Sequence, residues 1–224
     1  MSIITVDFDG TLYQQNSITP MLKAGNTIFT IKQWFYIIRD IAKGVAGKKT
    51  GEKIDARVLF LESFFRQMKG RSEEEIYDLF VSLVKRGQGG INFDLVARLT
   101  KHLEDGDQVV ILSGALQPFL EVFVQQLDIR ADVIGTLLFF DENGICTGEI
   151  GKINHGVEKV NRLKLWIKAN KVYGGEIWAY ADSESDIPLL EFADKAIIVQ
   201  PSNELKKVAE AKGWVTFIPS KEQG

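Results

Sequence analysis

The sequence has little of what builds crosslinked or nucleic-acid-binding proteins. Its 224 residues include one cysteine and five prolines, and 27 Lys+Arg stand against 30 Asp+Glu, for a formal net charge of -3. The single cysteine, Cys146, cannot form an internal disulfide, so we expect an ordinary strand or hairpin residue and a reducing compartment. Because the chain lacks the basic excess with which proteins displace phosphate counterions, we expect no nucleic-acid partner.

Long hydrophobic runs are missing as well. The most apolar stretch, from Ile28 to Ile41, is interrupted by charged residues and is shorter than the ~20 residues of a bilayer-spanning helix. The N-terminal residues lack the basic region and the apolar run of a secretion signal, so the sequence predicts a cytoplasmic protein without a membrane partner. A weaker alternative stays open, because the stretch from Ile28 to Lys49 is apolar on one face and ends in lysines, which is compatible with a lipid surface.

The rest of the composition, 45% hydrophobic and 25% charged, is typical of a globular protein whose length suits one large domain or a medium domain with an insertion. The run Ile3–Val6 predicts a buried strand. From Ser17 to Arg86 apolar residues recur at helical spacing, and Ser72 with Glu75 forms a capping box that begins a helix. The stretches 44–51 and 87–90 are glycine-rich and predict a loop between helices and a flexible joint.

After this joint, strands alternate with helices, as in a doubly wound, mostly parallel α/β sheet that is covered on both faces. The helical block is therefore an insertion after the first strand, so that residues 1–14 and 88–224 form the core and residues 15–87 form an all-helical second domain. The predicted helices cover Phe93–Asp105, Leu116–Leu127, His155–Ala169, Ile187–Phe192 and Asn203–Ala211. The predicted strands cover Asp107–Leu112, Ala131–Gly135, Glu176–Ala181, Ala196–Val199 and Trp214–Phe217, with a hairpin over Leu137–Phe140 and Ile145–Glu149.

Polar residues follow three of the predicted strands where those strands end. They are Asp7-Phe-Asp-Gly-Thr11, Ser113-Gly114 and Asp182-Ser-Glu-Ser-Asp186. Ligands of parallel sheets bind beyond the carboxyl ends of the strands, so we expect the three segments to meet. Crowded carboxylates raise one another's pKa unless a cation is present, and an oxygen-only set suits Mg²⁺, which commonly also binds a substrate phosphate. Each segment alone is compatible with an ordinary turn or helix cap, but the combination predicts phosphoryl chemistry.

These motifs resemble the haloacid dehalogenase (HAD) superfamily, in the order and spacing of its phosphoserine-phosphatase-like branch. The resemblance spans the core and includes the segments 156–163, 186–190 and 196–201. It implies a Rossmann-like core with an inserted helical cap. It also implies a Mg²⁺-dependent phosphatase that hydrolyses a small phosphomonoester through an aspartyl-phosphate intermediate.

The resemblance further implies a role for each matching residue. Asp7 would be the nucleophile and a metal ligand, and Asp9 the general acid and base, with its backbone carbonyl on the metal. Asp182 would bind the metal directly and Asp186 would support its water shell. The phosphoryl group would be bound by Thr11, Ser113, Gly114 and Lys159.

Some assignments stay open. Lys152 competes with Lys159, and we prefer Lys159 because the helix it opens is aimed at the site in the family. Phosphoserine phosphatases commonly carry a glutamate for the substrate ammonium where this chain has Gln14-Gln15-Asn16, so phosphoserine itself is disfavoured. Arg57 or Arg66 is a candidate for binding an anionic part of the substrate.

Other functions remain as alternatives. A phosphotransferase would use an alcohol in place of water, and a dehalogenase is disfavoured because Asp9 is present. A receiver-type phospho-acceptor domain is disfavoured because Ser113 stands where its aspartate would be. The sequence leaves monomer and homodimer open. The P-loop-like segment 44–50 and the lone histidines His102 and His155 predict no site. The aromatic residues Trp34, Phe35, Phe64 and Phe65 are assigned to the core of the cap, with the alternative that some of them line the substrate pocket or a dimer face.

Overall fold

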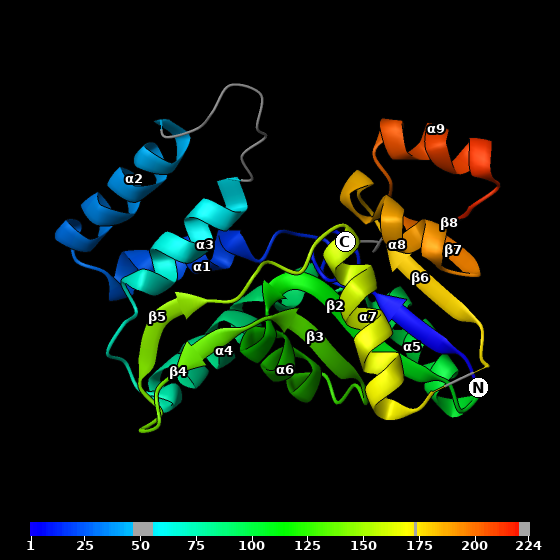
Figure 1. The fold of residues 1–224 in the computed structure, drawn as a ribbon, viewed down its shortest axis with the longest axis horizontal. Helices are drawn as coiled ribbons and strands as arrows, with labels where there is room; N and C mark the ends of the chain where they lie inside the picture. The colour runs from blue at the N-terminus through cyan, green and yellow to red at the C-terminus, as the bar shows by residue number, and fades with distance from the viewer. Residues whose placement is uncertain (47–55, 173, 220–224) are drawn as a thin grey trace.

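The computed structural model describes residues 1–46, 56–172 and 174–219. Its centre is a six-stranded sheet in the order β3-β2-β1-β6-β7-β8, in which every neighbouring pair is parallel (Figure 1). Strands β1, β2 and β3 follow one another toward one edge of the sheet, and β6, β7 and β8 follow one another toward the other edge. The strand order therefore reverses between β1 and β6. The strands are β1 (Ile3–Val6), β2 (Gln108–Leu116), β3 (Asp132–Thr136), β6 (Ile177–Ala181), β7 (Lys195–Val199) and β8 (Val215–Phe217).

Alternate residues of the central strands face two separate hydrophobic clusters. In β1, Ile4 and Val6 belong to the cluster that includes α5 (Phe93–Glu104) and α6 (Gln117–Gln126). Ile3 belongs to the cluster built with α7 (Val157–Asn170), α8 (Ile187–Phe192) and α9 (Asn203–Lys212). Burial on both faces explains why these strands are continuous apolar runs, and it confirms the predicted doubly wound α/β core.

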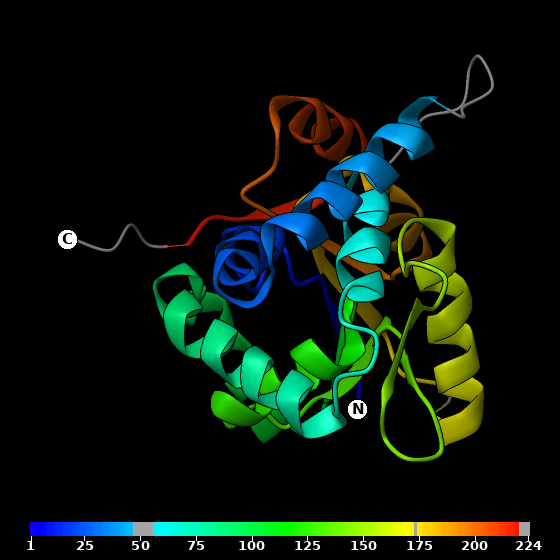
Figure 2. The same ribbon diagram turned by 90° about the vertical axis from the view of Figure 1, so that its left-hand side faces the viewer.

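All the described elements between β1 and α5 are helices, joined by turns. It contains α1 (Ile18–Ile28), α2 (Ile31–Ala46), α3 (Ala56–Arg66) and α4 (Glu73–Gly87), and the predicted capping box of Ser72 and Glu75 begins α4. Helices α1, α2 and α3 lie together at one end of the molecule (Figures 1 and 2). Helix α4 instead packs on α6, with the rings of Phe80 and Phe119 5.7 Å apart, so one hydrophobic cluster runs through both parts. The division at residues 15 and 87 stays a prediction.

A hairpin of β4 (Leu138–Phe140) and β5 (Cys146–Ile150) leaves the core and reaches the helices, where β5 packs on α3. Cys146 is buried in β5, as predicted, and its backbone exchanges hydrogen bonds with Gly70 and Arg71. The hairpin therefore provides a second contact between the helical segment and the core. The first is where the chain passes between these two parts, near residues 14 and 90, which we call the chain crossings.

Two predictions from glycine-rich stretches are wrong at single residues, Gly44 in the predicted loop and Gly90 in the predicted joint. Gly44 lies inside α2, where an added Cβ would be 2.6 Å from Leu59 Cδ2, so this glycine allows α2 and α3 to approach closely. The remaining residues of that predicted loop, 47–51, lie outside the described residues. Gly90 is buried rather than a flexible joint, because an added Cβ would be 2.5 Å from Tyr13 Cε2. Both glycines mark tight packing, which the chain pattern alone does not distinguish from a break.

The other predicted boundaries agree within a few residues, except that β2 continues through Ser113 to Leu116 with an irregular register after Leu112. The helix that follows begins at Gln117, so its first turn does not directly follow Ser113. Phe64 and Phe65 are fully buried as predicted, but Phe35 is 62% exposed, so its assignment to the core is wrong. Among the described residues, none of the helices is long and apolar enough to cross a membrane.

Candidate active site

The carboxyl ends of β1 and β6 meet at the point where the strand order reverses. The backbone N–H of Asp7 donates to Tyr180 O at 2.9 Å, which aligns the end of β1 with the last residues of β6. The chain then turns at Gly10, whose φ is 82°, and an added Cβ there would lie 2.0 Å from Asp182 Oδ2. Only glycine fits this place, because the backbone is left-handed and passes directly against the second acidic segment. Two segments 170 residues apart in the chain thereby share one edge, as the strand ends predicted.

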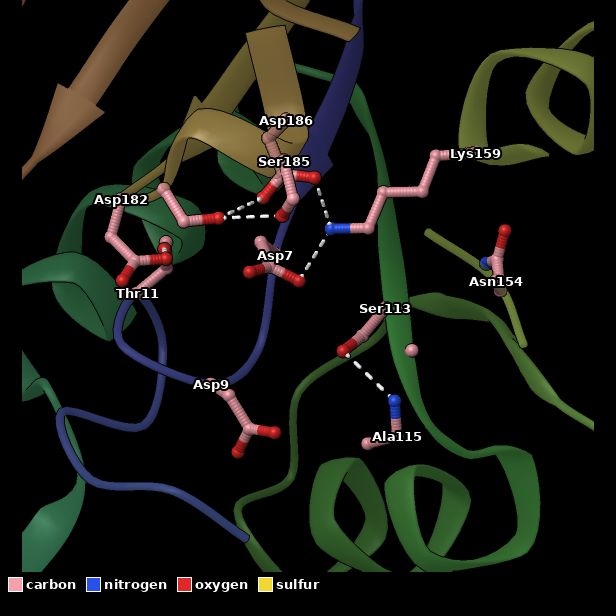
Figure 3. Close-up of polar contacts among 12 residues, drawn as sticks. Asp7, Asp9, Thr11, Ser113, Ala115, Asn154, Lys159, Asp182, Ser185 and Asp186 are labelled. Carbon is pink, nitrogen blue, oxygen red and sulfur yellow. Dashed lines mark hydrogen bonds and ion pairs between the residues drawn. The ribbon is translucent and has the colours of Figure 1, made fainter. Parts of the chain in front are cut away.

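Lys159 connects the acidic residues of this edge. Its Nζ lies 2.7 Å from Asp7 Oδ1 and 2.6 Å from Asp186 Oδ1 (Figure 3). All three residues are buried, and Lys159 stands in the first turn of α7. Burial alone would lower the pKa of Lys159, but the nearby charges of Asp186 and Asp7 outweigh it and raise the pKa above its usual value. Lys159 is therefore a fixed positive charge beside the carboxylate of Asp7.

One lysine does not neutralise all the carboxylates present. Asp7, Asp182 and Asp186 each offer an oxygen within 4.8 Å of the others. Burial, and then repulsion by Asp7 and Asp186, raises the pKa of Asp182 to about 7. Burial raises the pKa of Asp186 to about 6, with Lys159 opposing and Asp7 adding to the increase. A buried, oxygen-only set with excess negative charge fits a hard divalent cation such as Mg²⁺.

Of the two predicted phosphate-binding hydroxyls, that of Ser113 lines the cavity beside Asp7, whereas Thr11 is buried behind it. Ser113 is buried in the irregular part of β2, and its Oγ accepts a hydrogen bond from Ala115 N at 3.2 Å. The irregularity is held by Thr136, whose Oγ1 donates to Gly114 O at 2.8 Å. On the other side, Thr11 Oγ1 donates to Asp182 Oδ1 at 3.2 Å. Thus Ser113 and Gly114 lie beside Asp7, whereas Thr11 bonds to the candidate metal ligand.

Asp9 lies apart from the Lys159 cluster (Figure 3). Its Oδ1 accepts a hydrogen bond from Ser17 N at 2.7 Å, and its Oδ2 accepts one from Ser17 Oγ at 2.9 Å. Burial raises the pKa of Asp9 to about 6, with Ser17 opposing the shift and Asp7 adding to it. A carboxyl group with a pKa close to neutrality can both donate and accept a proton at physiological pH.

A cavity of about 560 Å³ opens over these residues. Asp7, Asp9, Ser113, Gly114, Lys159 and Asp182 all line it, so the structure brings together the predicted residues of the three strand ends and of α7, with Thr11 and Asp186 directly behind them. The opposite wall comes from α1 and α3, and includes Ile18, Arg57, Val58 and Leu61. Gln14, Gln15, Asn16 and His155 also line the cavity.

The structure separates the residues that the sequence left in competition. Lys152 is exposed and pairs with Glu158 at 2.6 Å, away from the acidic cluster. Arg66 pairs with Asp40 at 2.8 Å and does not line the cavity, whereas Arg57 does. The geometry therefore favours Lys159 for the phosphate and Arg57 for the substrate.

Comparison with known proteins identifies the chain's relatives. The sequence model of the haloacid dehalogenase-like hydrolases matches residues 4–191. The chain belongs to this family. Membership of this hydrolase family agrees with the site, because the residues that carried the resemblance are those that converge at the ends of β1, β2 and β6.

Several curated relatives of the chain carry phosphatase names. The chain is 32% identical over 118 residues to a histidinol-phosphatase of Neisseria meningitidis, a match that covers 50% of this chain and 52% of the relative. It is 25% identical over 213 residues to a phosphoserine phosphatase of Mycobacterium tuberculosis, covering 93% of this chain and 68% of the relative. The chain thus spans about half to two thirds of the curated relatives it matches.

A solved structure of a Bordetella pertussis protein of unknown function has the same fold as this HAD-like hydrolase. Its TM-score is 0.78 at 21% identity, and the match covers 96% of this chain and 97% of that chain. A probable phosphoserine phosphatase of Vibrio cholerae has a TM-score of 0.66 at 16% identity, over 96% of this chain and 60% of that chain. At these identities the likeness shows the fold alone.

Two further residues at the HAD-like site, Ser17 and Asn154, were not predicted from the sequence. Ser17 precedes α1 like a helix cap, yet its hydroxyl makes no cap hydrogen bond and bonds to Asp9. Asn154 is buried, and its Nδ2 donates to Ile134 O at 2.7 Å, which fixes the loop before α7. For Ser17, the only sequence signal was a serine eight positions after Asp9. For Asn154, the sequence contained no signal.

Proposed function

We propose that this protein is a Mg²⁺-dependent phosphatase that hydrolyses a small phosphomonoester through an aspartyl-phosphate intermediate on Asp7. The observation that carries the proposal is the position of Lys159 Nζ, 2.7 Å from Asp7 Oδ1 and 2.6 Å from Asp186 Oδ1, beside Asp182 and at the base of a cavity. A carboxylate with a fixed cation beside it, open to a cavity, is suited to attack phosphorus while the cation stabilises charge on the transferred group.

In the first half of the reaction, a carboxylate oxygen of Asp7 bonds to phosphorus and the bond from phosphorus to the ester oxygen breaks. The leaving oxygen takes the proton of Asp9, which Ser17 holds in place with two hydrogen bonds. Lys159, Ser113 and the backbone at Gly114 bind the phosphoryl oxygens. A charged, water-excluding cavity strengthens these interactions as negative charge moves onto the leaving oxygen.

In the second half, water attacks the phosphorus of the aspartyl phosphate and releases inorganic phosphate from Asp7. Asp9, left ionised by the first half, takes the proton of the attacking water and is thereby ready for the next substrate. The pKa of about 6 at Asp9 suits both directions of proton transfer.

The cation would be held by the carboxylates of Asp7 and Asp182 and by the backbone carbonyl of Asp9, with Asp186 behind them. When bound, Mg²⁺ supplies positive charge that neutralises the phosphoryl oxygens and orients them for in-line attack. The same carboxylates repel one another without it, and Thr11 orients Asp182 through its hydrogen bond.

For the substrate, we propose a phosphate ester of a small alcohol that carries a further anionic group. Arg57 lines the wall opposite the phosphate end of the cavity, and Val58 and Leu61 beside it offer apolar contacts. The names of the two relatives point to amino-acid-derived alcohols, although Gln14, Gln15 and Asn16 give this cavity neutral amides where an ammonium would favour a carboxylate.

The test is hydrolysis of a generic aryl phosphate with Mg²⁺ and with EDTA, comparing Asp7→Asn with Asp132→Asn, an exposed aspartate of β3. We expect EDTA and Asp7→Asn each to abolish turnover, and Asp132→Asn to retain it. Acid-quenched mass spectrometry should find a phosphoryl adduct on Asp7. Full activity of Asp7→Asn would refute the assignment, and transfer to added alcohols in preference to water would establish a phosphotransferase instead.

A screen of phosphorylated metabolites then identifies the leaving group. Arg57→Ala should raise KM for the preferred substrate while leaving the aryl phosphate almost unchanged, because only the former carries the anionic group that Arg57 contacts. Arg66→Ala is the matched control, since Arg66 pairs with Asp40 outside the cavity.

A further inference from the structure

Helix α2 exposes a row of large apolar side chains that the active site does not use. Ile31 is 91% exposed, Phe35 62%, Ile38 64% and Val45 55%. Their spacings of four, three and seven residues place them on one face of the helix, which we call the outer stripe of α2. Isolated exposed apolar residues are ordinary in soluble proteins, but four such residues aligned on one helix form a continuous patch.

The outer stripe is not a core face that lacks its partner. The adjacent face of the same helix is already packed: Ile37 is buried, the Trp34 ring lies 6.0 Å from Phe29, and Gly44 lies against Leu59 of α3. In Figure 2 α2 lies nearest the viewer, across α1 and α3, and in Figure 1 it lies at the outer end of the molecule. The helix is therefore held from within and presents its stripe outward.

A basic row runs beside the stripe. Lys32, Arg39 and Lys43 lie about 80 to 120° around the helix from Ile31, at the helical rotation of ~100° per residue. The only acidic residue of α2, Asp40, lies on the far side of this row and is paired with Arg39 at 2.7 Å and Arg66 at 2.8 Å. The helix surface is thus locally positive although the whole chain carries a net charge of -3.

We propose that the outer stripe of α2 binds the surface of an anionic lipid bilayer. An apolar stripe bordered by lysine and arginine matches the boundary between acyl chains and acidic headgroups, where the stripe inserts and the basic row remains with the headgroups. A second copy of the chain fits less well, because two copies joined through this face would bring two basic rows together. Binding is peripheral and reversible, since one helix face supplies all the apolar contact.

The test is cosedimentation of the full chain with vesicles of phosphatidylcholine alone or mixed with phosphatidylserine. We expect binding to the mixed vesicles only, weakened by added salt because the attraction is partly electrostatic. The double variant Phe35→Ser/Ile38→Ser should bind at least about tenfold more weakly, since it removes the inserted side chains. Lys32→Gln/Lys43→Gln should also reduce binding to the anionic vesicles.

Matched controls separate this surface from general stickiness. Leu165→Ser/Ile218→Ser removes two side chains that are 66% and 76% exposed elsewhere, and Lys206→Gln/Lys207→Gln removes two exposed charges of α9. Both should bind as the wild type does, and thermal unfolding checks that every variant is folded. No binding to anionic vesicles, or equal binding by the Phe35→Ser/Ile38→Ser variant, would overturn the proposal. So would a wild-type dimer that this variant converts to a monomer, because a second copy would then cover the stripe.

Discussion

Among the described residues, Lys159 is the one buried cation, and it lies between carboxylates that come from two different strand ends. Its removal would leave the buried carboxylates of Asp7 and Asp186 without their ion pairs at 2.7 and 2.6 Å. Breaking a buried pair by deleting one partner commonly costs about 3–5 kcal/mol, because the remaining charge is uncompensated. Under the proposed function, the same deletion would also remove the charge that binds the phosphoryl group.

We therefore predict that Lys159→Ala loses both stability and activity. Its free energy of unfolding in EDTA should fall by about 3 kcal/mol or more, and its turnover with Mg²⁺ by at least about 100-fold. Denaturant unfolding and steady-state hydrolysis measure the two effects. Lys152→Ala is the matched control, because Lys152 is exposed and paired with Glu158, and it should change neither quantity appreciably. Comparable losses in both variants would mean that the phosphate lysine is misassigned.

Ser17 provides a second prediction at a single residue, because both of its donors bond to Asp9. An alkyl phosphate needs a proton from Asp9 to expel its poor leaving group, whereas a nitrophenyl phosphate does not. We expect Ser17→Ala to lower kcat about 10–100-fold for the alkyl ester and within about threefold for the nitrophenyl ester. Ser17→Thr, which keeps the hydroxyl, should restore most of the loss. A purely structural role would lower both rates equally.

The positions of single residues were predictable where the sequence pattern places them at the end of a strand. Asp7 and Asp182 each end an apolar strand, and parallel strands share a carboxyl edge, so their meeting followed from the sequence. The partner of Asp9 did not, because Ser17 reaches it only through the turn at Gly10 and the start of α1. The choice between Lys152 and Lys159 also required the orientation of α7, which the helical pattern does not contain.

Between elements, small residues decide how closely the two parts of the molecule approach. Gly90 lies in the second chain crossing, where Gln14 N donates to Gly90 O at 2.7 Å and the Tyr13 ring covers the glycine. That ring cannot easily move aside, because it stacks on Phe8 at a centroid distance of 5.5 Å. Neighbouring Gly89 has nothing within 4 Å of its added Cβ.

The pair gives a controlled prediction about the crossing. Gly90→Ala should lower the free energy of unfolding by about 1–3 kcal/mol, because the new methyl group overlaps Tyr13 in a packed site. Gly89→Ala should stay within about 0.5 kcal/mol of the wild type. Thermal or urea unfolding of the two variants checks this, and equal stabilities would restore the interpretation of residues 87–90 as a flexible joint.

The elements themselves were largely predictable, because period-2 and period-3.6 patterns follow directly from burial of one face. The wrong predictions occurred where two different structural situations produce the same sequence pattern. Glycine marks either a break or a close approach, and Gly44 and Gly90 are close approaches. An apolar residue on a helix marks either a core or an exposed stripe, and Phe35 belongs to the stripe. The register irregularity of β2 at Ser113 depends on Thr136 and left no local signal.

At the scale of the whole molecule, the acidic edge couples folding to protons, and under the proposed function it would couple folding to Mg²⁺ as well. The folded protein brings Asp182 close to Asp7 and Asp186, and burial together with their repulsion raises its pKa to about 7. An unfolded aspartate titrates near ~3.9. Between these values the folded state binds more protons than the unfolded state, so the stability of the metal-free protein falls as the pH rises from about 4 to about 7.

Asp182→Asn removes this charge and should therefore stabilise the metal-free protein at pH 8, on the order of 1–3 kcal/mol, with the gain disappearing as the pH falls below about 4. With Mg²⁺ bound, the wild type should instead be more stable than Asp182→Asn. Mg²⁺ stabilises the wild type by an amount that grows with the ratio of free Mg²⁺ to the Kd of the folded state, whereas the variant has lost a ligand, binds more weakly and gains less. Thermal unfolding across pH, with EDTA and with saturating Mg²⁺, measures both effects. If Asp182→Asn were destabilised in EDTA at pH 8, or stabilised by Mg²⁺ as much as the wild type, the carboxylates would not form the metal site that the chemistry at Asp7 requires.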